Sequence, residues 1–154
     1  MRLDVKPVAE FSAEERGALL ALTAAVYPPE KTAVSPGRAI QWSSPEHGVL
    51  VLGPAGELVA YVGIVVRAGR LDGAPVKIGG VGSVKTHPVA FSLLVCQDHL
   101  QPFYGRLGWR AFTGRPLVEQ PAGRTEFTIN RPMVRPGLRP APEAGLIDLA
   151  GPPW

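Results

Sequence analysis

Three glycines lie close together in a segment that is expected to form a strand, and this spacing could let a ligand approach the backbone closely. They are Gly79, Gly80 and Gly82, within the stretch 76–88. Glycine inside a strand is typical of a bulge or of a backbone that approaches a ligand closely. A phosphate-binding P-loop that starts at Gly79 would need glycine at position 84, but Val84 stands there and His87-Pro88 interrupts any following helix. The segment therefore predicts a bulged strand and argues against nucleotide hydrolysis.

Cys96 and His99 are a second pair whose types could do chemistry, because a thiol beside an imidazole can act as a nucleophile. Such a pair needs a cleft and a third, orienting group, and a metal site needs three or four ligands. Asp98 and His87 are close in sequence, but Cys96 ends an apolar run. We therefore interpret Cys96 as a buried, unreactive thiol, and we predict no metal site.

The composition is that of one ordinary globular domain. A chain of 154 residues with 45% hydrophobic and 19% charged residues can bury a core without disulfides or metals. Its single cysteine excludes an intramolecular disulfide and suits a reducing compartment. The N-terminus lacks the pattern of a signal peptide, and no apolar run approaches the length of a membrane span. We therefore expect a cytoplasmic protein with no membrane partner.

Charge gives only a weak indication of partners. The formal net charge is +3, and the arginines are scattered along the chain. A nucleic-acid-binding surface would need clustered basic residues, so we predict no nucleic-acid partner.

The N-terminal half predicts a helix between strands. Ser12 followed by Glu15 forms a capping box, so a helix is expected from there to Val26, before Pro28-Pro29 ends it. Leu19, Leu22 and Val26 should share one face of this helix. The expected strands of this half lie at residues 2–8, 49–52 and 58–66, with a short helix around 39–42.

In the C-terminal half, the continuous apolar run Phe91–Cys96 predicts an interior strand covered on both faces. A short helix at His99–Leu107 should follow, ended by Gly108. Further strands are expected at residues 74–86, 109–113 and 125–134. The proline-rich segment 136–154 is expected to be irregular but docked on the body through its apolar residues. The whole chain, 1–154, is expected to form one domain.

This order of elements and the motif Phe103-Tyr104-Gly105-Arg106-Leu107-Gly108-Trp109 resemble the GCN5-related N-acetyltransferase (GNAT) superfamily over nearly the whole chain. In that family, an aromatic-Tyr pair is followed by a few residues and then by glycine with an aromatic residue. The resemblance implies an α+β fold, with a mixed, strongly twisted sheet flanked by helices. Segments 109–133 and 147–154 are similar to the aminoglycoside 2'-N-acetyltransferase-like branch.

The resemblance also implies a chemistry, in which an amine of a small molecule attacks the thioester of acetyl-CoA directly. Strand amides hold the pantetheine arm, a tyrosine protonates the departing thiolate, and amides at a helix N-terminus hold the pyrophosphate. Matched by position, Ser83, Val84 and Thr86 fall on the pantetheine strand. Tyr104 matches the general acid, and Gln97 falls where the family often has an asparagine that faces the cofactor.

The pyrophosphate loop has no match in this sequence. After His87-Pro88 the family expects an Arg/Gln-x-x-Gly-x-Gly/Ala stretch and a helix, whereas here only Val89-Ala90 precedes the next strand. Neighbouring parallel strands need a crossover of roughly a dozen residues or more. We therefore expect that segments 74–86 and 91–96 are not parallel neighbours. They could instead pair antiparallel through a tight loop at residues 87–90, form one bent strand, exchange between subunits, or flank a stretch omitted from the sequence.

Two functions stay open on the sequence. One is an N-acetyltransferase that uses acetyl-CoA as co-substrate and a small-molecule amine as acceptor. The other is a degenerate, non-catalytic module that no longer binds CoA and forms a homodimer, in which a second copy covers the apolar run 91–96. The missing loop favours the module, and the intact flanking motifs favour the enzyme. No general base is evident: in the family the segment of Glu46 and His47 lines the acceptor pocket, but solvated loop charge is the simpler interpretation.

Overall fold

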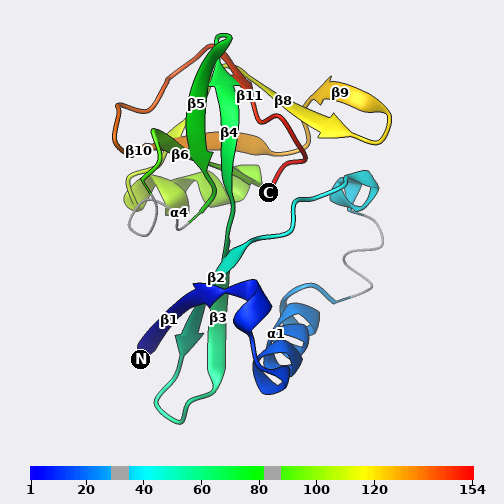
Figure 1. The fold of residues 1–154 in the computed structure, drawn as a ribbon, viewed down its shortest axis with the longest axis vertical. Helices are drawn as coiled ribbons and strands as arrows, with labels where there is room; N and C mark the ends of the chain where they lie inside the picture. Colours follow the sequence, from blue (N-terminus) through cyan, green and yellow to red (C-terminus); the bar gives the residue numbers. More distant parts are fainter. Residues whose placement is uncertain (29–34, 82–87) are drawn as a thin grey trace.

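The computed structural model of the chain describes residues 1–28, 35–81 and 88–154. These residues form a three-stranded sheet and an eight-stranded sheet, drawn in the lower and upper parts of Figure 1. Strand β3 (Leu58–Ile64) of the small sheet continues into β4 (Val66–Leu71) of the large one, with only Val65 between them. The predicted long strand 58–66 is therefore two strands that join the two sheets.

The small sheet carries the first helix. Its antiparallel strands lie in the order β1 (Arg2–Pro7), β2 (His47–Leu52) and β3. Helix α1 (Ala13–Val26) begins at the predicted capping box, in which the Ser12 side chain accepts from the Glu15 amide and the Glu15 side chain accepts from the Ser12 amide. Leu19 packs against a small core beneath the helix, but Val26 is 56% exposed. The predicted apolar face therefore covers only part of the helix.

The large sheet is mixed, and its strands follow the order β7-β10-β6-β5-β4-β11-β8-β9. Its remaining strands are β5 (Ala74–Gly79), β6 (Phe91–Cys96), β7 (Arg110–Ala111), β8 (Arg115–Gln120), β9 (Gly123–Glu126), β10 (Arg131–Pro136) and β11 (Leu146–Asp148). The pairs β5–β6 and β11–β8 are parallel, and the other pairs are antiparallel. Strands β4 and β5 form a hairpin around Asp72 and Gly73, whose φ angles are 49° and 83°, as a two-residue hairpin turn requires.

The pairing of β5 with β6 corrects the predicted topology. The two strands are parallel neighbours, in register at Ile78 with Phe91 and at Gly79 with Ser92. Strand β5 ends at Gly79, well before the predicted end at residue 86, so residues 80–90 are available for the crossover. The expectation that they could not be parallel neighbours was wrong because it placed the strand end too late.

Strand β6 lies in the interior, as its apolar run predicts. On one face, Phe91 and Leu93 join a core cluster with residues of β5, β8, β10 and β11. On the other face, Leu94 and Cys96 pack with Trp109 and are covered by Tyr104 of helix α4. Because both faces are covered within one chain, the burial of this strand does not require a second copy.

Other differences concern the C-terminal third. The predicted helix 99–107 is a 3-10 turn, Asp98–Leu100, followed by α4 (Gln101–Arg106), and Gly108 has the positive φ of 84° expected after a helix end. The predicted strand 109–113 is reduced to β7, and 125–134 is divided between β9 and β10. Strands β8 and β11 were not predicted, while the predicted short helix near residue 39 is a 3-10 turn at Pro36–Ala39.

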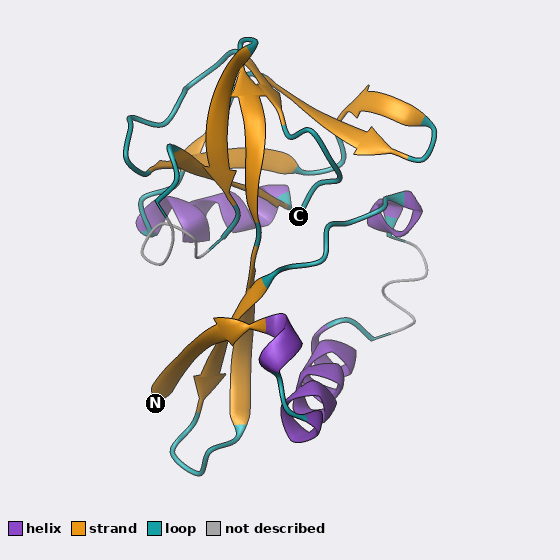
Figure 2. Ribbon diagram, in the orientation of Figure 1, coloured by secondary structure: helices purple, strands orange, loops and turns teal. Residues whose placement is uncertain are grey.

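The segment after β10 packs on the large sheet but is not irregular throughout, because it contains β11. Ile147 and Leu149 are 0% and 1% exposed and belong to the main core cluster. Figure 2 shows the C-terminus at the edge of the large sheet that faces the small sheet. Within the part of the chain that the structure describes, no helix is long and apolar enough to cross a membrane.

Candidate active site

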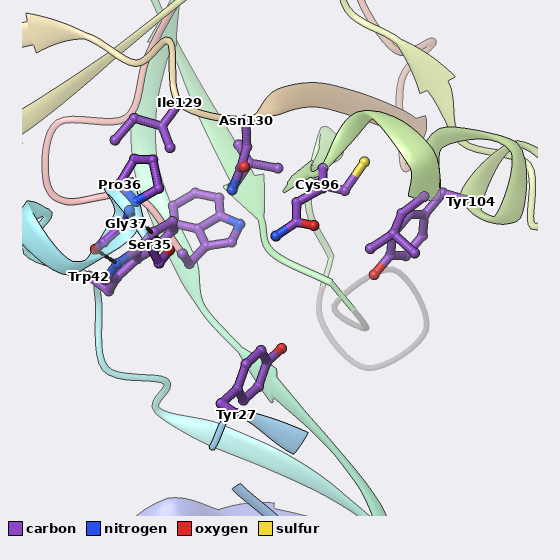
Figure 3. A pocket seen from close by; sticks show the side chains of 13 residues that line it. Tyr27, Ser35, Pro36, Gly37, Trp42, Cys96, Tyr104, Ile129 and Asn130 are labelled. Atoms are coloured by element: carbon purple, nitrogen blue, oxygen red, sulfur yellow. Dashed lines mark hydrogen bonds between the residues drawn. The ribbon is translucent and has the colours of Figure 1, made fainter. Parts of the chain in front are cut away.

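A cavity of about 870 Å³ lies where the end of β6 faces Tyr27 and residues 35–42. This volume is within the usual range for small-molecule sites, roughly 300–1,000 Å³. Figure 3 shows Cys96 and Tyr104 on one side, Ser35, Pro36 and Trp42 on the opposite side, and Tyr27 below them. Segments distant in sequence therefore build its walls, because Ile129, Asn130 and Trp154 line it as well.

Tyr104 lies on this wall because α4 packs across β6. Its ring makes edge-to-face contacts with Phe103 at 5.2 Å and with Trp109 at 6.4 Å between centroids, and such contacts fix the ring orientation. Burial raises the pKa of the Tyr104 hydroxyl, and the nearby Cys96 thiol and Tyr27 hydroxyl add to this effect. The hydroxyl therefore keeps its proton at neutral pH and can act as a donor.

Gln97 also lines the cavity, at the end of β6. Its backbone is extended and precedes the 3-10 turn that leads into α4. A neutral amide here can donate and accept hydrogen bonds. The structure thus brings Gln97 and Tyr104, two of the five predicted site residues, to one cavity. The predicted pantetheine residues Ser83, Val84 and Thr86 lie outside the described residues.

Cys96 is buried, as predicted, although it also contributes to the cavity wall. Its Sγ lies 3.7 Å from Sδ of Met133, and burial, followed by the charge of Asp98, raises its thiol pKa. His99 does not line the cavity. Among the residues described here, no group of three His, Cys, Asp or Glu side chains is placed to hold a metal ion.

Trp154 lies at the point where β5 and β6 part. Its indole N–H donates to the carbonyl oxygen of Leu93 at 2.9 Å, immediately beyond the last residue of β6 that pairs with β5. A Cβ on Gly80 would lie 2.8 Å from the Trp154 ring. The predicted close approach to the glycine-rich segment is therefore real at Gly80, but the group that approaches is a tryptophan of the same chain.

Arg67 lies behind Trp154. Its guanidinium carbon is 5.2 Å from the centroid of the indole, and its nitrogens donate to the Pro152 carbonyl at 2.6 Å and to the Ser43 hydroxyl at 2.5 Å. Burial lowers the pKa of Arg67 from its ordinary value, but an arginine remains charged at neutral pH. A positive charge, with the carboxylates of Glu46 and Glu119 near it, therefore lies behind one wall of the cavity.

The described part of the cavity wall carries no formal charge. Among the described residues that line it there is no Asp, Glu, Lys, Arg or His. Glu46 and His47, the segment considered for a general base, are not among them; the Glu46 carboxylate instead accepts from the Val66 amide at 3.3 Å.

Similar proteins are found by comparing structures rather than sequences. No family model matches the sequence, and no curated protein matches it. A crystal structure of an acyl-CoA N-acyltransferase from Pseudomonas aeruginosa is similar, with a TM-score of 0.51 and 17% identity, over 88% of this chain and 99% of that one. Escherichia coli ElaA is similar with a TM-score of 0.54 and 19% identity, over the same shares of the two chains, 88% and 99%. The chain has the GNAT acyl-CoA N-acyltransferase fold. The predicted α+β class, with a mixed sheet and flanking helices, is thus confirmed.

Within this GNAT fold, sequence reasoning missed the aromatic residues of the cavity other than Tyr104. Tyr27, Trp42 and Trp154 all line it, but the sequence analysis gave none of them a role at a site, although Trp154 lies in the segment 147–154 that it compared with a family branch. One signal was available, because Trp42 and Trp154 are large aromatic residues isolated in polar or proline-rich stretches. An isolated aromatic residue in such a stretch usually has either a packing partner or a ligand.

Proposed function

We propose that this protein transfers an acyl group, most simply acetyl, from acyl-CoA to the amine of a small molecule. The observation that carries the proposal is the position of Tyr104. In a GNAT fold, a protonated tyrosine held by α4 lines a cavity at the end of β6. A tyrosine whose role was only to pack α4 against β6 would not have to face a cavity.

The strand geometry supports a place for the thioester at this end of the cavity. Pairing between β5 and β6 extends over only two residue pairs, Ile78–Phe91 and Gly79–Ser92, so the strands part before β6 reaches Cys96 and Gln97. Beyond Leu93, whose carbonyl already accepts from Trp154, backbone groups at the end of β6 could bind an extended ligand as an added strand would. The assignment of Ser83, Val84 and Thr86 to the pantetheine arm follows from the family resemblance and stays a prediction.

In the proposed reaction, the amine nitrogen attacks the thioester carbonyl carbon and the C–N bond forms. The C–S bond breaks, and the departing CoA sulfur takes the proton of the Tyr104 hydroxyl. The nitrogen loses one proton to water, from which Tyr104 is reprotonated. The products are the N-acyl amine and CoA thiol, so atoms and charge balance without a metal or redox partner.

The test is the Tyr104→Phe variant, assayed for CoA thiol release from acetyl-CoA with a panel of amines. Loss of a general acid should lower kcat by about 10²- to 10⁴-fold, and the folded state should change little because the ring contacts remain. Burial raises the Tyr104 pKa above its ordinary value of 10.0. The wild-type rate should therefore decline at alkaline pH only above about 10. The pH–rate profile of the variant should lack this decline.

The matched control is Tyr61→Phe. Tyr61 is another half-buried tyrosine whose pKa is raised by burial, but it packs edge-to-face with Phe11 in the small sheet and is not among the cavity residues. This variant should keep the wild-type rate. An unchanged rate in Tyr104→Phe would remove Tyr104 from the mechanism, and absence of any acetyl-CoA binding by calorimetric titration would contradict the proposed function itself.

A further inference from the structure

Trp154 is a large residue of the cavity wall whose ring is held by three separate contacts. Its indole N–H donates to the Leu93 carbonyl oxygen at 2.9 Å, and its pyrrole edge lies so close to Gly80 that a Cβ there would stand 2.8 Å away. The Arg67 guanidinium carbon lies 5.2 Å from the ring centroid. The ring also packs against the main core cluster while it lines the cavity. It therefore cannot withdraw from the cavity without breaking these contacts.

Arg67, on β4, is itself fixed by the segment that carries Trp154. Its nitrogens donate to the Pro152 carbonyl at 2.6 Å and to the Ser43 hydroxyl at 2.5 Å, and the Ser43 hydroxyl donates in turn to the Pro152 carbonyl at 2.8 Å. A planar guanidinium can stack on an aromatic ring and donate within its own plane at the same time, whereas a lysine ammonium cannot. Arg67 thus connects the indole to the backbone around it.

The Trp154 ring stands in the opening between β5 and β6. The last residues of the two strands that pair with each other are Gly79 and Ser92. Gly80 and Leu93 follow them directly, and these are the two residues that the indole contacts. The proposed function places the thioester near the end of β6, just past this opening. An acyl chain that extends from the thioester toward the core therefore meets the ring.

A ring fixed at this point sets an upper limit on size. Protein interiors are close-packed and yield little to an extra group, so a long acyl chain would have to displace the indole and its contacts. A two- or three-carbon acyl group is short enough to stop before the ring. If the ring were removed, each additional methylene that reached the apolar space left behind would gain about fourfold in binding.

We infer that Trp154 limits the size of the transferred acyl group and that Arg67 is a positioning residue, which holds the indole in the opening between β5 and β6. This inference rests on the proposed acyltransferase function and specifies its donor. The donor is a short-chain acyl-CoA, acetyl or propionyl, rather than one with a medium-length chain.

The experiment compares kcat/KM for acetyl-CoA and hexanoyl-CoA at neutral pH, with one amine acceptor throughout. In the wild type, acetyl-CoA should be preferred by at least about tenfold, and Trp154→Ala should shift this ratio toward hexanoyl-CoA by at least about tenfold. Any loss of folded protein lowers both rates alike, so the ratio reports only the wall. An unchanged ratio in Trp154→Ala, or a wild type that uses hexanoyl-CoA as well as acetyl-CoA, would overturn the inference.

Two further variants separate the ring from its support. Trp154→Phe keeps an aromatic ring without the N–H donor and should retain most of the preference for acetyl-CoA. Arg67→Lys keeps the charge but not the planar stack, and should shift the ratio in the same direction as Trp154→Ala by a smaller factor. A wild-type ratio in Arg67→Lys would remove Arg67 from the inference.

Trp42→Leu is the matched control, because Trp42 lines the same cavity from the wall opposite Tyr104. It should leave the ratio between the two donors unchanged. A shift as large as that in Trp154→Ala would contradict the placement of the acyl group beside Trp154.

Binding is measured independently of turnover, by calorimetric titration of acetyl-CoA and hexanoyl-CoA. Hexanoyl-CoA should bind Trp154→Ala at least about tenfold more tightly than it binds the wild type, while acetyl-CoA should bind the two proteins with similar Kd. If acetyl-CoA binds and hexanoyl-CoA has the same Kd for both proteins, the inference falls and the proposed function stands. If acetyl-CoA does not bind the wild type and no amine releases CoA thiol, the proposed function has failed, and the inference fails with it.

Discussion

Cys96 shows how one residue can line a cavity and still be unreactive. Its side chain is 4% exposed and contacts Met133, and burial raises its thiol pKa. A raised pKa means that, at pH 8, less of the thiol is ionised than in a free cysteine, and only the thiolate is the nucleophile.

We therefore predict slow labelling of the native protein by a disulfide reagent such as DTNB at pH 8. The rate should be lower than in the guanidinium-unfolded chain by roughly an order of magnitude or more. Cys96 is the only cysteine of the sequence, so the release of thionitrobenzoate has one source. Equal rates in the native and unfolded states would show that the thiol is open to the cavity and would revive its interpretation as a nucleophile.

Site residues could be predicted only where chemistry and a local motif coincide. Tyr104 and Gln97 reach the cavity because the strand-to-helix unit that carries them is continuous in sequence. Trp154 reaches it through long-range contacts, with the Leu93 carbonyl and the surface of Gly80. No local pattern encodes such contacts, so the sequence indicated only that this segment docks.

Among the elements, helix α1 combines a capped first turn with packing through partly buried side chains such as Leu19. No residue of α1 is fully buried, so this packing contributes less hydrophobic free energy than a fully buried helix face would. Its N-terminus is closed by the Ser12–Glu15 capping box, and the Glu15 carboxylate also accepts from Lys6 at 2.6 Å.

Ser12→Ala should consequently lower the free energy of unfolding by about 1 kcal/mol, as loss of an N-cap typically does. Urea denaturation followed by circular dichroism at 222 nm would measure it. Ser44→Ala is the matched control, because Ser44 is exposed and outside any helix or strand, and it should change stability by less than about 0.5 kcal/mol. Equal effects of the two substitutions would mean that the capping box does not stabilise the helix.

Elements were predictable where the local pattern agrees with the tertiary environment. The apolar run Phe91–Cys96 and the capped helix Ala13–Val26 have the bounds or nearly the bounds that the sequence predicts. Strands β8 and β11 were missed because β11 has only three residues and β8 begins Arg115-Pro116. Their strand conformation comes from pairing with each other and with β9 and β4, and strand preference depends strongly on such context.

The topology of the whole molecule depends on where β5 ends. A strand that continued to residue 86 would have left too little chain for a parallel crossover, whereas an end at Gly79 leaves residues 80–90. The sequence could not place this end, because glycines weaken a strand without specifying at which of them pairing stops. The earlier end of this one strand was thus enough to permit the parallel pairing that the sequence analysis had excluded.

At the same scale, the last segment of the chain connects parts that are distant in sequence. Strand β11 lies between β4 and β8, the Leu149 amide donates to the Leu117 carbonyl at 2.9 Å, and the Ser43 amide donates to the Pro153 carbonyl at 2.7 Å. If this segment folds together with the rest of the protein in one cooperative unit, a buried apolar side chain within it should contribute to the free energy of unfolding as much as one at the centre of the sheet.

Leu149→Ala tests this expectation. Leu149 is 1% exposed within the main core cluster, so its truncation should lower the free energy of unfolding by about 2–5 kcal/mol, the sum of lost burial and the cavity left behind. Leu138→Ala is the matched control: the same substitution, in the same C-terminal part of the chain, at a side chain that is 75% exposed, should cost less than about 0.5 kcal/mol. Both are measured by chemical denaturation with two probes, circular dichroism and tryptophan fluorescence. A small loss in Leu149→Ala, or transitions that no longer coincide, would mean that the segment unfolds separately, and the cavity wall formed by Trp154 would then be lost before the rest of the site.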